Sequence, residues 1–175
     1  MIEHASGLLQ GAVIDTARIK STSYLDRLIQ DYHPIMTSSG PNYIIEGGVA
    51  VALHYPNFRS EPNDIDIIAF DKKIVQSMRN AHNDWCDVHD PRQWFGDRNI
   101  PFTVAGLIYL QQSFTRIDLL NVKDTVYILN PRVLAASKLF QFRGMEMRPK
   151  DLFDLMNLNI GRQDIEDAMV ALQGK

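Results

Sequence analysis

The sequence predicts an α+β protein, with a small mixed β-sheet, flanking helices and a C-terminal helical segment. Short apolar runs of strand length recur up to residue 129 with helical patterns between them, and helix signals take over from residue 130. With 175 residues, 45% of them hydrophobic, the chain is long enough for one well-buried domain. We expect a core over residues 1–129 and a helical segment over residues 130–175 packed on it, as one compact domain.

The first expected elements lead from a helix to a glycine pair. A helix is predicted near residues 21–37 by apolar side chains at helical spacing, namely Tyr24, Leu25, Leu28, Ile29 and Tyr32. Residues 38–42 have the composition of a loop. A strand over residues 43–46 then ends at Gly47-Gly48, and a helix is expected over residues 49–55.

The middle of the chain is expected to supply most of the sheet. Residues 56–63 contain two prolines and are predicted to be irregular. A strand over residues 64–70 and a helix over residues 72–83 follow. A strand meander is then expected from three β-rich runs, at residues 101–110, 114–122 and 125–129.

The last third of the chain is predicted to be helical. Asn130-Pro131 has the pattern of an N-cap followed by proline at the first helical position, so a helix is expected to run to about residue 142. A further helix begins near Arg148-Pro149.

Composition indicates which classes of partner and which cellular compartment to expect. A net charge of -3 and a pI near 5.9 give no global footprint for nucleic acid, although a local basic patch remains open. The single cysteine, Cys86, allows no intramolecular disulfide and fits a reducing compartment. The sequence has neither a signal-peptide pattern nor an 18-residue apolar run, so we expect a cytoplasmic protein without a membrane partner.

The most informative chemical pattern is Gly47-Gly48 followed by Asp64-Ile65-Asp66. Residues i and i+2 of a strand share a face, so the two carboxylates project together while Ile65 and Ile67 face a core. Two like charges on one face repel each other, and a divalent cation would remove that cost. The glycines let a backbone approach a phosphate at a helix start, although the same pair would also suit a plain tight turn.

Three further charged residues are candidates for the same site. Asp118 would complete an acidic trio if its strand lies beside that of Asp64 and Asp66, and otherwise it is an edge-strand acid facing water. Lys138 lies on the packed side of its helix, where it either snorkels to the surface or meets an anion. Asp151 is either a functional acid or the N-cap of the helix that begins near Arg148-Pro149.

His82, Cys86 and His89 have loosely zinc-like spacing. One thiol and two imidazoles without a fourth ligand make a weak zinc site. We expect this region, with Trp85, Trp94 and Phe95, to be a surface insertion with packed aromatic side chains and not a base-stacking platform.

In order along the chain, these motifs resemble the DNA polymerase β-type nucleotidyltransferase superfamily. The residues that carry the resemblance are Gly47-Gly48, Arg59-Ser60, Asp64-Ile65-Asp66, Lys138 and the run from Arg148 to Asp154. Within the superfamily the sequence is most similar to the AbiEii-like group, which includes toxins of type IV toxin/antitoxin systems. The similarity is an ordered set of short motifs over residues 43–158.

The resemblance implies transfer of a nucleoside monophosphate from an NTP to an acceptor, either tRNA, a protein or a small molecule. It implies Mg²⁺ or Mn²⁺ as cofactor and an antitoxin as a partner of a toxin. It assigns nucleotide binding to Gly47, Gly48, Arg59, Ser60 and Lys138. It assigns metal binding or catalysis to Asp64, Asp66, Asp118, Lys138 and Asp151.

Two departures from the family pattern keep other functions open. Many members have Gly-Ser where this chain has Gly47-Gly48, and the spacer before Asp64 is long and holds Pro56 and Pro62. One alternative is therefore a catalytically silent relative that serves as a nucleotide-binding or protein-interaction module. Another is an antibiotic-modifying nucleotidyltransferase.

Overall fold

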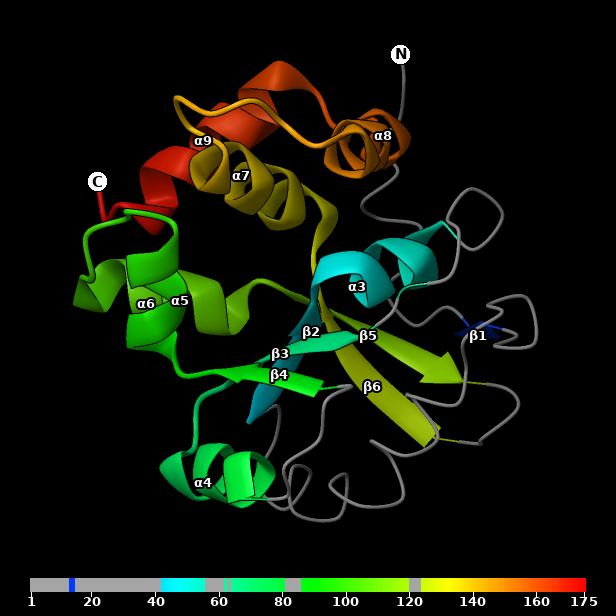
Figure 1. The fold of residues 1–175 in the computed structure, drawn as a ribbon, viewed down its shortest axis with the longest axis vertical. Coiled ribbons are helices and arrows are strands. Elements are labelled where there is room, and N and C mark those ends of the chain that lie inside the picture. Colours follow the sequence, from blue (N-terminus) through cyan, green and yellow to red (C-terminus); the bar gives the residue numbers. More distant parts are fainter. Residues whose placement is uncertain (1–12, 15–41, 56–61, 63, 81–85, 120–123) are drawn as a thin grey trace.

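A mixed β-sheet forms the centre of the computed structural model, which describes residues 13–14, 42–55, 62, 64–80, 86–119 and 124–175. Within these residues the strand order is β1-β5-β6-β2-β3-β4 (Figure 1). The strands are β1 (Val13–Ile14), β2 (Tyr43–Glu46), β3 (Ile65–Ala69), β4 (Cys86–His89), β5 (Phe114–Leu119) and β6 (Asp124–Leu129). The predicted α+β class is confirmed.

The strand pairing decides which side chains meet at the edge of the sheet. β2 runs antiparallel to β3, and β3 runs parallel to β4. Their register places Glu46 opposite Asp66, and Asp66 opposite Asp87. On the other side of β2, the sheet continues through the parallel strand β6 to β5, which is antiparallel to β6. Acidic residues from three neighbouring strands are thus aligned in one row.

Helices cover both faces of the sheet. In Figure 1, α7, α8 and α9 lie on one side of the sheet and α4 on the other. The helices of the described residues are α3 (Gly47–His54), α4 (Lys72–Asn80), α5 (Pro91–Asp97), α6 (Val104–Gln112), α7 (Pro131–Gln141), α8 (Pro149–Leu158) and α9 (Arg162–Leu172). None of these helices is long and apolar enough to cross a membrane.

Helix α7 begins as its sequence predicts. The side chain of Asn130 accepts a hydrogen bond from the backbone N–H of Val133 at 3.0 Å, and Pro131 occupies the first turn. The helix packs against α9, α8 and α3. Its buried residues include Leu134 and Phe140, together with Lys138, which is 8% exposed. Lys138 therefore faces the interior, which places a positive charge under α8.

Residues 101–110 were expected to be a strand, and that expectation is wrong. They contain most of α6, whose N-cap Thr103 accepts a hydrogen bond from the N–H of Gly106 at 3.0 Å. Gly106 packs so closely on α9 that an added Cβ would collide with the carbonyl of Leu172. Tertiary packing and a local cap thus override the strand pattern of this apolar run.

Residues 86–97 include the described part of the region that was expected to be a surface insertion with packed aromatic side chains. The packing is confirmed, and the surface position is wrong. These residues form β4 and α5, and Trp94 and Phe95 are both fully buried in the core. Asp90 caps α5 by accepting a hydrogen bond from Gln93 N at 2.9 Å, and Pro91 follows it. The helix predicted near residues 21–37 lies outside the described residues.

Candidate active site

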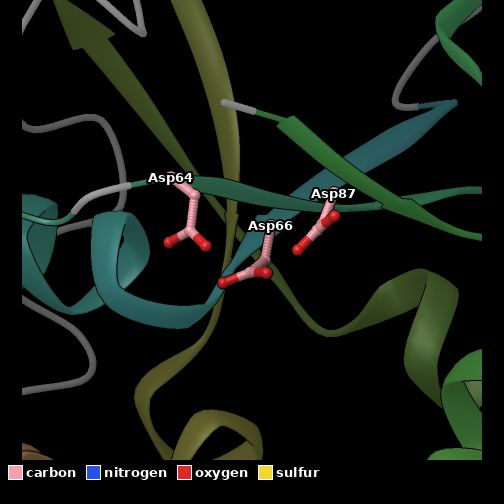
Figure 2. A group of neighbouring side chains, drawn as sticks. All are labelled: Asp64, Asp66 and Asp87. Carbon is pink, nitrogen blue, oxygen red and sulfur yellow. The ribbon is translucent and has the colours of Figure 1, made fainter. Parts of the chain in front are cut away.

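Three aspartates from two adjacent strands gather at the edge of the sheet. Asp64 and Asp66 come from the start of β3, and Asp87 comes from β4 directly opposite Asp66. Each offers one carboxylate oxygen, and these oxygens all lie within 4.8 Å of one another. Figure 2 shows the three side chains pointing to the same side of the two strands. Oxygen atoms this close, from three carboxylates, are suitable ligands for Mg²⁺ or Mn²⁺.

Asp118 does not belong to this cluster. It lies on β5, which is separated from β3 by β6 and β2, so the condition on which its role depended is not met. It also lies toward the opposite end of the strands, where it pairs with Thr125 and accepts a hydrogen bond from the Thr125 hydroxyl at 2.6 Å. Asp87 occupies the third position in its place, and only the register of β4 with β3 reveals it.

The pKa of Asp66 is raised to about 7. Burial is the largest cause, because it disfavours the charged form. Repulsion from Glu46, Asp64 and Asp87 adds to it, whereas Arg98 partly offsets it. A cation among these carboxylates would reverse the balance, since it would favour the ionised form of Asp66.

The raised pKa predicts an unusual dependence of stability on pH. Without a divalent cation, the native protein holds a proton on Asp66 that the unfolded chain releases, so this group makes stability fall as pH rises from about 4 through about 7. Magnesium should reverse much of that loss. Urea unfolding at about pH 5 and pH 8, with EDTA or with Mg²⁺, measures both effects. Asp66→Asn should remove this part of the pH dependence of stability and also the stabilisation by Mg²⁺. An unchanged stabilisation by Mg²⁺ in this variant would contradict the role of Asp66 as a metal ligand.

The glycine turn lies against Asp66. Gly47 has a φ of +65°, a conformation that favours glycine, and it starts α3 directly after Glu46. A Cβ added at Gly47 would overlap the Oδ2 atom of Asp66. No side chain caps the start of α3, so the backbone N–H groups of its first turn remain suited to an anion. The two halves of the sequence pattern, the glycine turn and the acidic strand, are therefore in direct contact.

Gly47→Ala is expected to disable the site. The methyl group must displace the Asp66 carboxylate, and alanine is strained at positive φ by roughly 1–2 kcal/mol. Binding of Mn²⁺ should weaken at least about tenfold if the displaced carboxylate contributes more than about 1.4 kcal/mol to it. Titration with Mn²⁺ checks this, and Gly144→Ala, which has a φ of +77° but open space around its added Cβ, is the matched control for backbone strain. Equal Mn²⁺ affinity in both variants would contradict the proposed contact.

A cavity of about 470 Å³ opens over these groups, within the size range of small-molecule sites. Gly47, Gly48 and the three clustered aspartates line it. Its other acidic lining residues are Glu46, Asp97 and Asp151. Its basic lining residues are Arg98, Lys138, Arg148 and Lys150. A cavity with carboxylates at the sheet edge and cations from α7 and α8 suits a metal ion and a polyphosphate together.

Lys138 is the centre of a buried ion network. Its Nζ lies 2.8 Å from Asp151 Oδ1 and 3.1 Å from Asp154 Oδ2. Arg148 Nε donates to the other oxygen of Asp151 at 2.6 Å. Asp151 is therefore neither a free surface acid nor an N-cap, since the N-cap of α8 is Arg148. The network ties α8 to α7 at the wall of the cavity.

Asp151 is held in its ionised form. Burial raises its pKa, but the hydrogen bonds and charges of Lys138 and Arg148 outweigh burial and hold the pKa below its ordinary value. A carboxylate with a low pKa is a weak proton acceptor. Lys138 Nζ donates a hydrogen bond to Asp151, lies 3.1 Å from Asp154 Oδ2 as an ion pair, and lines the cavity as well. Asp151 thus positions a lysine that can reach a phosphate.

A second buried ion pair lies on the other side of the cavity. Glu46 is 2% exposed and accepts hydrogen bonds at Oε2 from Trp94 Nε1 at 2.7 Å and from Arg98 Nη2 at 2.9 Å. The Arg98 guanidinium lies over the Trp94 ring, 4.2 Å from its centroid. Neither Glu46 nor Arg98 was a candidate from sequence, because only the packing of α5 on β3 and β4 brings them together.

The family of the chain is shown by comparison with known proteins. A family model described as nucleotidyltransferase of unknown function, DUF6036, matches residues 23–168. The chain belongs to this nucleotidyltransferase family. A search of curated proteins finds no significant match.

Arg59 and Ser60, which the resemblance assigns to nucleotide binding, lie outside the described residues, and so does His82, one of the weak zinc candidates. Of the weak zinc candidates, Cys86 and His89 lie three residues apart on β4, so their side chains face opposite sides of the strand. Burial raises the pKa of the Cys86 thiol to about 12, and nearby acids add to the shift, so the thiolate that zinc requires is disfavoured. His89 instead pairs with Asp97, with Nδ1 and Oδ2 3.5 Å apart, at the wall of the cavity.

Proposed function

We propose that the protein is a metal-dependent enzyme that transfers a nucleoside monophosphate from an NTP to a hydroxyl group of an acceptor. One observation carries this proposal. Asp64, Asp66 and Asp87 converge beside the Gly47 turn in the same cavity that Lys138 lines. This arrangement supplies ligands for a cation and donors for phosphates in one space.

The donor set fits Mg²⁺ or Mn²⁺. The three clustered carboxylates are hard oxygen ligands, and such ions are typically held by a few carboxylates and the substrate's phosphates. Repulsion among Asp64, Asp66, Asp87 and Glu46, which raises the pKa of Asp66, is a cost that a cation would remove. When bound, the cation would neutralise charge on the attacking and leaving oxygens.

The remaining groups of the cavity suit the triphosphate. The N–H groups of the first turn of α3 offer hydrogen bonds to phosphate oxygens. The ammonium of Lys138 and the cations of Arg148 and Lys150 line the other side. In the reaction, the hydroxyl oxygen of the acceptor forms a bond to the α-phosphorus and its proton passes to solvent, while the bond from the α-phosphorus to the bridging oxygen breaks and pyrophosphate leaves. The role of these residues is to hold the reacting groups in line and to stabilise the charge that develops.

Incubation with labelled NTP tests the proposal. The protein with Mg²⁺ or Mn²⁺, each α-labelled NTP and pools of RNA, protein or small molecules should give a labelled acceptor and free pyrophosphate. Loss of label in Asp64→Asn/Asp66→Asn assigns the product to this site. Nucleotide binding without any labelled product would instead support the catalytically silent nucleotide-binding module.

The identity of the third carboxylate gives a separate prediction. Asp87→Asn is expected to lower the transfer rate by about 100-fold, the effect of losing one electrostatic contact in such a site. Asp118→Asn is its matched control and should leave the rate within about twofold, because Asp118 bonds with Thr125 away from the cavity. Single-turnover rates of the two variants decide between them. A large loss in Asp118→Asn with a normal Asp87→Asn would contradict this account.

We further propose that the protein is an AbiEii-like toxin. Support comes from the order of the motifs and from the contacts of Lys138 with Asp151 and Asp154, which join the last two of them in one network. Expression of the wild-type chain should arrest growth of the host, whereas Asp66→Asn should not. Equal growth of both strains, with transfer activity present in the wild type, would assign the activity to a role other than toxicity.

A further inference from the structure

Arg98 is held at the cavity by several contacts. Its Nη2 donates to Glu46 at 2.9 Å and its Nη1 donates to the carbonyl oxygen of Trp94 at 3.1 Å. The guanidinium also lies 4.2 Å from the centroid of the Trp94 ring. The side chain is only 10% exposed, yet it lines the cavity. These contacts fix the plane of the guanidinium before any ligand binds.

The fixed plane has one covered face and one side toward the cavity. Trp94 is fully buried and covers the first face. Arg98 also lines the cavity. A planar guanidinium stacks well on aromatic rings, as its contact with Trp94 already shows. A ring that enters the cavity beside Arg98 would therefore meet a guanidinium that is already oriented for stacking.

Arg98 lies on a different element from the other cations that line the cavity. It is the C-cap of α5 and is paired with Glu46 of β2. Lys138, Arg148 and Lys150, which line the cavity from α7 and the start of α8, supply cations for phosphates. Around Arg98 the wall instead holds His89 and Asp97, whose side chains can form hydrogen bonds with the edge of a base.

We propose that Arg98 is the platform on which the nucleobase of the NTP stacks, with Trp94 supporting it from behind. This inference rests on the proposed nucleotidyltransferase function and deepens it. The triphosphate then extends from Arg98 past the three aspartates toward α3 and Lys138.

Binding measurements on two arginine variants test the platform. Arg98→Lys keeps the positive charge that pairs with Glu46 but removes the planar guanidinium group. Arg92→Lys is the matched control, because Arg92 also lies over an aromatic ring of the same region, 4.4 Å from the centroid of Phe102, but does not line the cavity. The probes are an NTP and ribose 5′-triphosphate, each with Mn²⁺, since the second has the sugar and phosphates without the base.

Arg98→Lys is expected to weaken binding of the NTP roughly tenfold, within the range measured for stacking on one base, and to change binding of ribose 5′-triphosphate less than about twofold. Arg92→Lys should change neither. Equal weakening of both probes, or unchanged binding of the NTP, would overturn the platform while the proposed function stands. If Arg98→Lys does not fold, the platform is tested by comparing the two probes on the wild type. The platform requires the wild type to bind the NTP more tightly than ribose 5′-triphosphate. A wild type that binds neither probe overturns the proposed function itself, and the platform with it.

Discussion

Replacing Asp64 and Asp66 together with asparagine is expected to lower the rate of nucleotidyl transfer by about 1,000-fold or more. The two side chains have nearly the same size as their replacements, so the change removes charge and leaves packing in place. Without these carboxylates the site loses the ligands that would hold a divalent cation beside the Gly47 turn. Single-turnover transfer from an α-labelled NTP measures the effect.

Asp71→Asn is the matched control for this double variant. Asp71 follows the far end of β3 and accepts a hydrogen bond from the backbone N–H of Lys73 at 2.8 Å, away from the acidic cluster. Its replacement should leave the transfer rate unchanged within about twofold. If the double variant retained wild-type activity while Mg²⁺ was still required, the cation would have to bind elsewhere, and the assignment of Asp64 and Asp66 would be wrong.

Lys138→Met is expected to cost about 3–5 kcal/mol of the free energy of unfolding, the range measured when one partner of a buried ion pair is removed. The side chains of Asp151 and Asp154 are 3% and 0% exposed. Without Lys138, these two buried acids would lose the positive charge that lies between 2.8 and 3.1 Å from both of them. Urea unfolding measures the loss.

The same network predicts a partial rescue. Lys138→Met combined with Asp151→Asn and Asp154→Asn should recover part of the lost stability, because the uncompensated charges are gone. Lys150→Met is the matched control, since Lys150 lies exposed on the first turn of α8. A loss as large in Lys150→Met as in Lys138→Met, or no rescue by the neutral acids, would contradict the network.

Local patterns predict the first part of the site well. The strand of Asp64 and Asp66 and the turn at Gly47 depend on period-two alternation and on glycine, which act within a few residues of sequence. The structure adds the contact of Gly47 with Asp66. The N-cap of α7 at Asn130 is local in the same way and is confirmed.

Residues whose position depends on strand order are not predictable in this way. Asp118 was a candidate from the sequence and Asp87 was not. Only the order β5-β6-β2-β3-β4 separates the first from the site and brings in the second. The four residues of β4 include no continuous apolar run from which a strand could be predicted. Arg98 and Glu46 likewise meet across 52 positions of sequence. For Lys138, helical periodicity indicates the inward face, but its acidic partners come from another helix.

The most direct test of the central claim is the position of Mn²⁺ in crystals grown with the metal and a non-hydrolysable NTP. Anomalous scattering locates the ion without assumptions about the protein. We predict a peak among the carboxylates of Asp64, Asp66 and Asp87, with the phosphates of the nucleotide between that peak and the first turn of α3. A peak at other residues, or a nucleotide bound away from the Gly47 turn, would contradict the account.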